Sequence, residues 1–152
     1  MSFQRTAFTL VELLLAVLFL GIFAYITVPR LQTSIIERYK SETTAQKIVT
    51  DLRLTRTMAI TEAASNSAGF ALQMAGTSPY SGYTIVNLAN GQTVSTHTIT
   101  TKIFCSGGAI FKFGPMGNLL AGSGSQLVVW ASGKTSTISL IPATGAVQCN
   151  EN

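Results

Sequence analysis

The sequence predicts an α+β protein: a long N-terminal helix, transmembrane in its first half, packs its second half on a C-terminal antiparallel β domain. Two observations lead to this fold class. Residues 8–29 form an apolar stretch with one internal acid, and residues 69–152 alternate with a period of two between glycine-rich turns. The chain has 152 residues and a formal net charge of +4, which suits one compact domain with an appendage.

The apolar stretch is long enough to span a bilayer only if it includes an acid. The run from Leu13 to Val28 would extend about 24 Å as a helix, less than the ~30 Å hydrocarbon core. Adding residues 8–11 brings it to about 31 Å and places Glu12 inside the segment. We therefore expect a hydrophobic helix over 8–33 that carries Glu12 with it.

A buried carboxylate of this kind needs a partner. Inserting an acidic side chain at the bilayer centre costs about 2.5 to 3.5 kcal/mol of free energy, and less near the bilayer edge. A carboxylate near the N-terminus of the helix is favoured by the positive end of the helix dipole. A cut before Phe8 would create an α-amino group within reach of Glu12 in the same chain or in a neighbouring copy. Residues 1–7 are polar and include Arg5, which would hold the N-terminus in the cytoplasm.

The following segment, 34–63, has the period of an amphipathic helix. Apolar residues recur at steps of three and four, and charged residues fill the other positions. Arg53 and Arg56 are interpreted as part of a solvated face. Gly21 and Pro29 are the predicted bending points of the long helix. The predicted apolar positions are Leu31, Ile35, Ile36, Tyr39, Ile48, Val49, Leu52, Ala59 and Ile60.

The β domain is predicted over 69–152 as short strands separated by turns. Its strands are indicated at Phe70 to Met74, Thr84 to Leu88, Ile110 to Phe113, Leu127 to Trp130 and Ile138 to Ile141. No linker divides this part.

The N-terminal residues carry a resemblance to a known family. Ala7-Phe-Thr-Leu-Val-Glu12, followed by a long apolar helix, resembles the class III leader and N-terminal helix of type IV pilins and type II secretion pseudopilins. The chain departs from the family at Ala7, where glycine is usual. The order of the helix, the strands, Phe113-Gly-Pro-Met-Gly117 and the final "ISLIPATGAVQC" resembles the H-type pseudopilins and related minor pilins.

The resemblance implies a processing pathway and a set of partners. A prepilin peptidase would remove the leader, residues 1–7, between Ala7 and Phe8 and methylate the new N-terminus. The chain would then sit in the bacterial inner membrane with its globular domain, 34–152, in the periplasm. Other pilins, the inner-membrane assembly platform and the lipid bilayer would be its partners. Phe8 and Glu12 would make subunit contacts in the filament, where a minor subunit primes assembly near the tip.

Several alternatives stay open. The helix could be an ordinary secretory signal or a single-pass anchor with an incidental Glu12. The host machine could be a pilus or a secretion system. A DNA-binding minor pilin is the second functional class, with Lys102, Lys112 and Lys134 as candidate phosphate contacts. It is not favoured, because "GAVQ" at 145–148 lacks the arginine that such pilins commonly have there.

The sequence offers little for catalysis. The single histidine, His97, is interpreted as a solvent-facing strand residue, and no two acids form a convincing acid/base pair. We expect no enzyme activity, no metal site and no cofactor. If the β domain is exported, Cys105 and Cys149 would be expected to form a disulfide.

Overall fold

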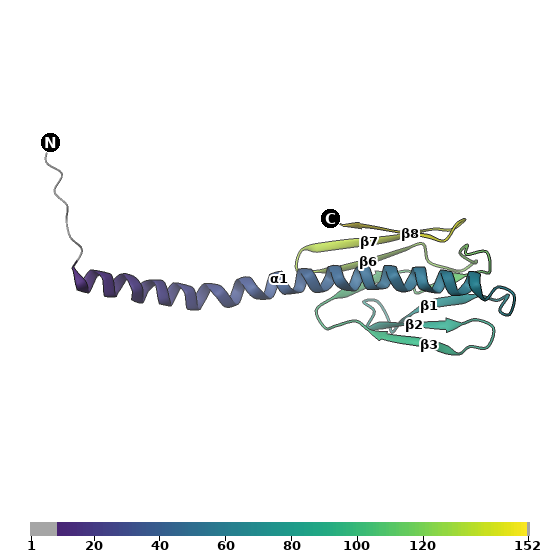
Figure 1. Ribbon diagram of the computed structural model, residues 1–152, viewed down its shortest axis with the longest axis horizontal. Helices are drawn as coiled ribbons and strands as arrows, with labels where there is room; N and C mark the ends of the chain where they lie inside the picture. The colour runs from purple at the N-terminus through teal and green to yellow at the C-terminus, as the bar shows by residue number, and fades with distance from the viewer. Residues whose placement is uncertain (1–8, 152) are drawn as a thin grey trace, which may run out of the picture. The chain divides into compact units, whose positions relative to one another are not determined.

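The computed structural model describes the backbone of residues 9–151 and the side chains of 9–27 and 35–151. It has an α+β fold in which helix α1 (Leu10–Thr61) precedes eight strands (Figure 1). The helix agrees within two residues with the predicted range from Phe8 to Ala63. The chain divides into two compact units between Ile36 and Glu37, close to the predicted boundary at 33/34.

The strands form two antiparallel four-stranded sheets. The first sheet has the order β3-β2-β1-β5 and the second β4-β6-β7-β8. Residues 37–61 of α1 belong to the same compact unit as both sheets. The strands are β1 (Phe70–Ala75), β2 (Gly82–Asn87), β3 (Thr93–Thr98), β4 (Phe104–Gly107), β5 (Ile110–Phe113), β6 (Gln126–Ala131), β7 (Lys134–Ile141) and β8 (Ala146–Glu151).

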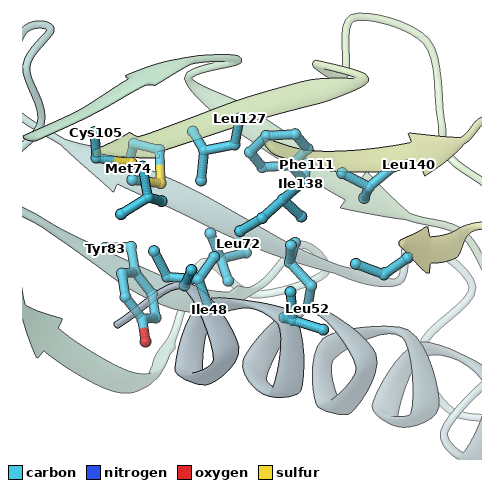
Figure 2. Packing of buried hydrophobic residues seen from close by; sticks show 14 of the residues in the cluster. Ile48, Leu52, Leu72, Met74, Tyr83, Cys105, Phe111, Leu127, Ile138 and Leu140 are labelled. Atoms are coloured by element: carbon cyan, nitrogen blue, oxygen red, sulfur yellow. The ribbon is translucent and has the colours of Figure 1, made fainter. Parts of the chain in front are cut away.

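A single hydrophobic core joins the helix to both sheets. One stripe of α1, at alternating steps of four and three residues, is buried completely: Ser41, Ala45, Ile48, Leu52, Thr55 and Ala59. Figure 2 shows Ile48 and Leu52 of this stripe with Leu72 and Tyr83 of the first sheet and with Leu127 and Ile138 of the second. The core of the globular unit therefore lies entirely within residues 45–149.

The predicted apolar stripe of the helix is correct from Ile48 to Ala59 but not before or after these residues. Ile48, Val49, Leu52 and Ala59 are buried, whereas Ile35, Ile36, Tyr39 and Ile60 are exposed. The side chain of Leu31 lies outside the described set. Small residues of the helix are buried against the sheets instead. The polar side chain of Thr55 can be buried there because its hydroxyl donates to the Asp51 carbonyl at 2.6 Å.

One buried amide fixes the turn after the helix. Asn66 is 3% exposed; its Nδ2 donates to the Gly69 carbonyl and to Asn87 Oδ1, both at 2.9 Å. Its Oδ1 accepts from the Gly69 N–H at 2.9 Å. Gly69 has a φ of 81°, and a Cβ there would meet the backbone carbonyl of Phe113. This corner sets where β1 begins relative to the helix.

Candidate membrane and assembly segment

Thr9 caps the start of α1. The Glu12 N–H lies 3.3 Å from Thr9 Oγ1 and 3.0 Å from the Thr9 carbonyl, and the Leu13 N–H donates to the same carbonyl at 3.2 Å. The spacing Thr-x-x-Glu is that of a capping box, and an acid in the first turn is favoured by the helix dipole. The hydrogen bonds of this cap use the backbone N–H of residue 12 and leave the Glu12 carboxylate available for a contact with another chain.

The first unit presents an exposed apolar helix. Residues Leu10–Thr27 have a mean hydropathy of 2.4, and no residue of this stretch is buried. It would extend about 27 Å as a helix, slightly less than the ~30 Å hydrocarbon core. Its 18 residues nevertheless fall within the range of about 17 to 25 that spanning helices use, and its composition is apolar enough to cross a membrane. A single N-terminal apolar helix is compatible with a single-pass membrane anchor.

The predicted processing and bending sites are placed only in part. Ala7 and Phe8, at the expected cleavage point, lie outside the described residues. Helix α1 is assigned without interruption through Gly21 and Pro29, so bending at these two positions stays a prediction. Among the described residues nothing lies within 4 Å of a Cβ placed on Gly21, so packing against this part of the chain does not require glycine there.

The first residue of the globular unit, Glu37, is held by two loops. Its carboxylate accepts from Lys102 Nζ at 2.9 Å and from the Ser132 hydroxyl in the β6–β7 turn. Arg38 Nε donates to the Ser132 carbonyl at 3.3 Å. The Ser132 and Lys102 hydrogen bonds lower the pKa of Glu37, and Glu37 in turn raises the pKa of Lys102.

A second group of charges joins the helix to the last two strands. Lys134 Nζ lies 2.9 Å from Glu42 and 3.4 Å from Glu151, and Gln46 Nε2 donates to Glu151 at 3.2 Å. The Glu42 hydrogen bond is the main reason that the pKa of Lys134 is raised. Two of the three lysines considered for DNA binding are therefore paired with carboxylates, and Lys112 is half-buried on β5.

The interpretation of Arg53 and Arg56 as part of a solvated face is correct only in part, because Arg53 is exposed and Arg56 half-buried, yet both also bind the β domain. Arg53 Nη2 donates to the Val147 carbonyl at 3.3 Å, and Arg56 Nε donates to the Gly117 carbonyl at 3.1 Å. Both guanidinium groups bind loop or strand backbone that is distant in the sequence. They help to hold the helix against the β domain, which composition alone could not indicate.

His97 also differs from its prediction. It lies on the edge strand β3, but its side chain is only 27% exposed and its Nε2 is 3.5 Å from Asp51 Oδ2. Tyr83 donates its hydroxyl to the same oxygen at 2.6 Å, and the Tyr83 and His97 ring centroids are 5.2 Å apart. Burial, followed by the Asp51 hydrogen bond, raises the pKa of Tyr83.

This cluster fastens α1 to β2 and β3. Asp51 is buried and Tyr83 is 2% exposed, so both groups lie between the helix and the first sheet. Within the described residues, no group of three or more His, Cys, Asp or Glu could hold a metal ion.

The expected disulfide is not formed. Both cysteines are free thiols, Cys105 on β4 and Cys149 on β8. These are the two outer strands of one sheet, separated by β6 and β7. Three strand spacings of about 4.8 Å place them about 14 Å apart, which is beyond the ~7 Å limit for the Cα atoms of a disulfide.

Comparisons of the chain with protein-family models, curated proteins and solved structures found no match. The fold and the exposed segment thus define the chain as an α+β protein with one N-terminal helix that is apolar enough to act as a membrane anchor.

Proposed function

We propose that this chain is a minor pilin or pseudopilin, a structural subunit that primes assembly near the tip of a type IV pilus or a type II secretion pseudopilus. The observation that carries the proposal is a capped apolar helix whose described side chains from Leu10 to Thr27 bury nothing within the chain. An apolar surface of this extent needs lipid or other helices around it.

The arrangement of the core supports the same function. The helix residues of the hydrophobic core begin at Ala45, so this core does not use the apolar segment from Leu10 to Thr27. The segment can therefore move from a membrane into a filament without exposing the core. In this proposal the globular domain lies in the periplasm, and the partners are a prepilin peptidase, the assembly platform and other pilins.

Glu12 would pair with the methylated N-terminal amine of a neighbouring subunit. In a low dielectric an unpaired charge is costly, so such a pair penalises a wrong axial register more than it adds affinity. The DNA-binding alternative receives less support, because Lys102 and Lys134 already pair with carboxylates.

The first test is mass spectrometry of the full-length chain expressed with and without a prepilin peptidase. A peptidase-dependent N-terminus at Phe8, with or without a methyl group, is the expected result. A chain that still begins at Met1, or one cut after residue 27, would overturn the proposal.

A second test separates the charge of Glu12 from its role in capping. The cap uses the backbone N–H of residue 12, so Glu12→Gln keeps it and removes the charge. We expect the Gln variant to be processed normally but to fail to join filaments. Leu14→Gln changes another exposed position of the helix and serves as the matched control for polarity.

A further inference from the structure

The outward face of the β4-β6-β7-β8 sheet is uncharged. Residues that alternate along each strand point either into the core or away from it. The charged residues of these strands, Lys134 and Glu151, are on the inward side, where they bind each other and Glu42 of the helix. The outward residues are Phe104, Ser106, Gln126, Val128, Trp130, Thr135, Thr137, Ser139, Ile141, Ala146, Gln148 and Asn150.

An aromatic pair lies at one end of this face. Phe104 and Trp130 are direct partners across β4 and β6. Their ring centroids are 5.7 Å apart, with an angle of 25° between the ring planes. Phe104 is 44% exposed, although it is a large apolar residue on a sheet surface. The two rings thus form an accessible aromatic surface.

Hydroxyl and amide groups continue the face across β7 and β8. Thr135 on β7 is the cross-strand partner of Trp130 on β6. Thr137 on β7 is paired with Val128 of β6 on one side and with Asn150 of β8 on the other. Within the described part of the chain, the side chains of Thr135, Thr137 and Asn150 make no hydrogen bond, and the same holds for the side chains of Ser106, Gln126, Ser139 and Gln148. By contrast, threonines of the helix such as Thr50 and Thr57 bond to their own backbone.

We propose that this face binds a neutral polysaccharide built of hexopyranose units. A pyranose ring has an apolar C–H face that can pack on Phe104 and Trp130, and its rim of hydroxyls matches free Ser, Thr, Asn and Gln side chains. Charge complementarity selects an uncharged ligand, because a nucleic acid needs cations beside its phosphates and the face has none. The inference is independent of the assembly function proposed above.

The test uses the full-length chain in lauryldimethylamine oxide micelles, a detergent without a sugar head group. Trp130 is the only tryptophan, so its fluorescence reports on the face directly. We expect titration with cellohexaose or hexa-N-acetylchitohexaose, both uncharged, to give a saturable change with a Kd of about 0.1 to 1 mM. Isothermal calorimetry on the same samples supplies a readout that does not depend on the fluorophore.

Two variants and one control locate the binding. Phe104→Leu keeps an apolar side chain but removes the ring, and Thr137→Val removes one hydroxyl at nearly constant shape. We expect affinity to fall about tenfold or more for the first and about threefold for the second. Met116→Leu, at an 87% exposed position in the loop after β5, changes no residue of this face and should bind like the wild type. An unchanged urea midpoint shows that each variant is folded.

Four outcomes would overturn the proposal. The first is the absence of a saturable signal with both sugars, and the second is equal affinity for wild type and Phe104→Leu. The third is stronger binding of a single-stranded DNA 20-mer than of either sugar. The fourth is a Trp130 signal that depends on protein concentration rather than on sugar, which would instead assign the face to contact with a second copy.

Discussion

Asn66→Asp is the most informative single substitution in the globular unit, because it changes one atom at a buried corner. The Asp side chain still accepts from the Gly69 N–H, but it cannot donate to the Gly69 carbonyl or to Asn87 Oδ1. Two hydrogen bonds of about 1 kcal/mol each are lost, although the Gly69 carbonyl keeps the Leu88 N–H and Asn87 Oδ1 keeps the Ala89 N–H as donors. The new carboxylate oxygen is buried without a donor and faces these two acceptors, which adds about 1 to 3 kcal/mol. We therefore expect a loss of about 3 to 5 kcal/mol in the free energy of unfolding.

The assay is thermal and urea unfolding of the full-length chain in micelles, followed by Trp130 fluorescence. For a unit of this size, about 4 °C per kcal/mol gives a fall in Tm of roughly 12 to 20 °C. Burial beside two acceptors should raise the pKa of the new carboxyl. The defect should then be full at pH 7 and smaller at pH 4, where a protonated Asp regains one donor.

The matched control is Asn90→Asp in the exposed β2–β3 turn. There the amide oxygen accepts from the Gln92 N–H at 2.9 Å, and a carboxylate can replace it. We expect a change in Tm of less than about 2 °C for this variant. A fall for Asn66→Asp as small as that of the control would refute the reasoning, because it would mean that the corner contributes nothing to stability.

Three further variants or reactions test the core, a tight turn and the thiols. Leu52→Ala should lower the free energy of unfolding, measured with urea, by about 3 kcal/mol, whereas Leu54→Ala at an exposed position should lower it by less than about 0.5 kcal/mol. Similar losses for the two variants would contradict the burial of Leu52 in the core. Gly145→Ala should destabilise more than Gly91→Ala, since both have positive φ but only at 145 would a Cβ meet a backbone carbonyl. Burial raises the pKa of Cys105 to about 12, so its alkylation at pH 8 should be slow in the native chain and fast in urea; rapid native labelling would show that the thiol is accessible.

Regular elements with strong local patterns could be predicted from the sequence. Alternation of large apolar residues indicated β1, β5 and β6, and the observed strands lie within a few residues of the predicted ones. Strands β4 and β8 were not predicted as separate elements. Their sequences, "FCSG" and "AVQCNE", contain too few apolar residues for the period of two to be visible.

The exposed apolar segment was the part of the candidate site that sequence could identify. The composition of residues 10–27 determines its hydropathy regardless of the fold. The Thr9 cap was not predicted, although the spacing Thr-x-x-Glu is a local signal for it. The contacts of Arg53 and Arg56 could not be foreseen in this way. Their acceptors, the carbonyls of Val147 and Gly117, belong to segments remote in sequence.

The sequence by itself determined the long helix, its apolar first half and the β-rich second half, because hydrophobic periodicity is a property of neighbouring residues. Only the tertiary structure decided which distant residues meet. Strand order places Cys105 and Cys149 at opposite edges of one sheet, and it brings Tyr83 and His97 of adjacent strands to Asp51 on the helix. Strand order and the packing of the two sheets on the helix depend on burying one shared core, so they cannot be read from any local pattern.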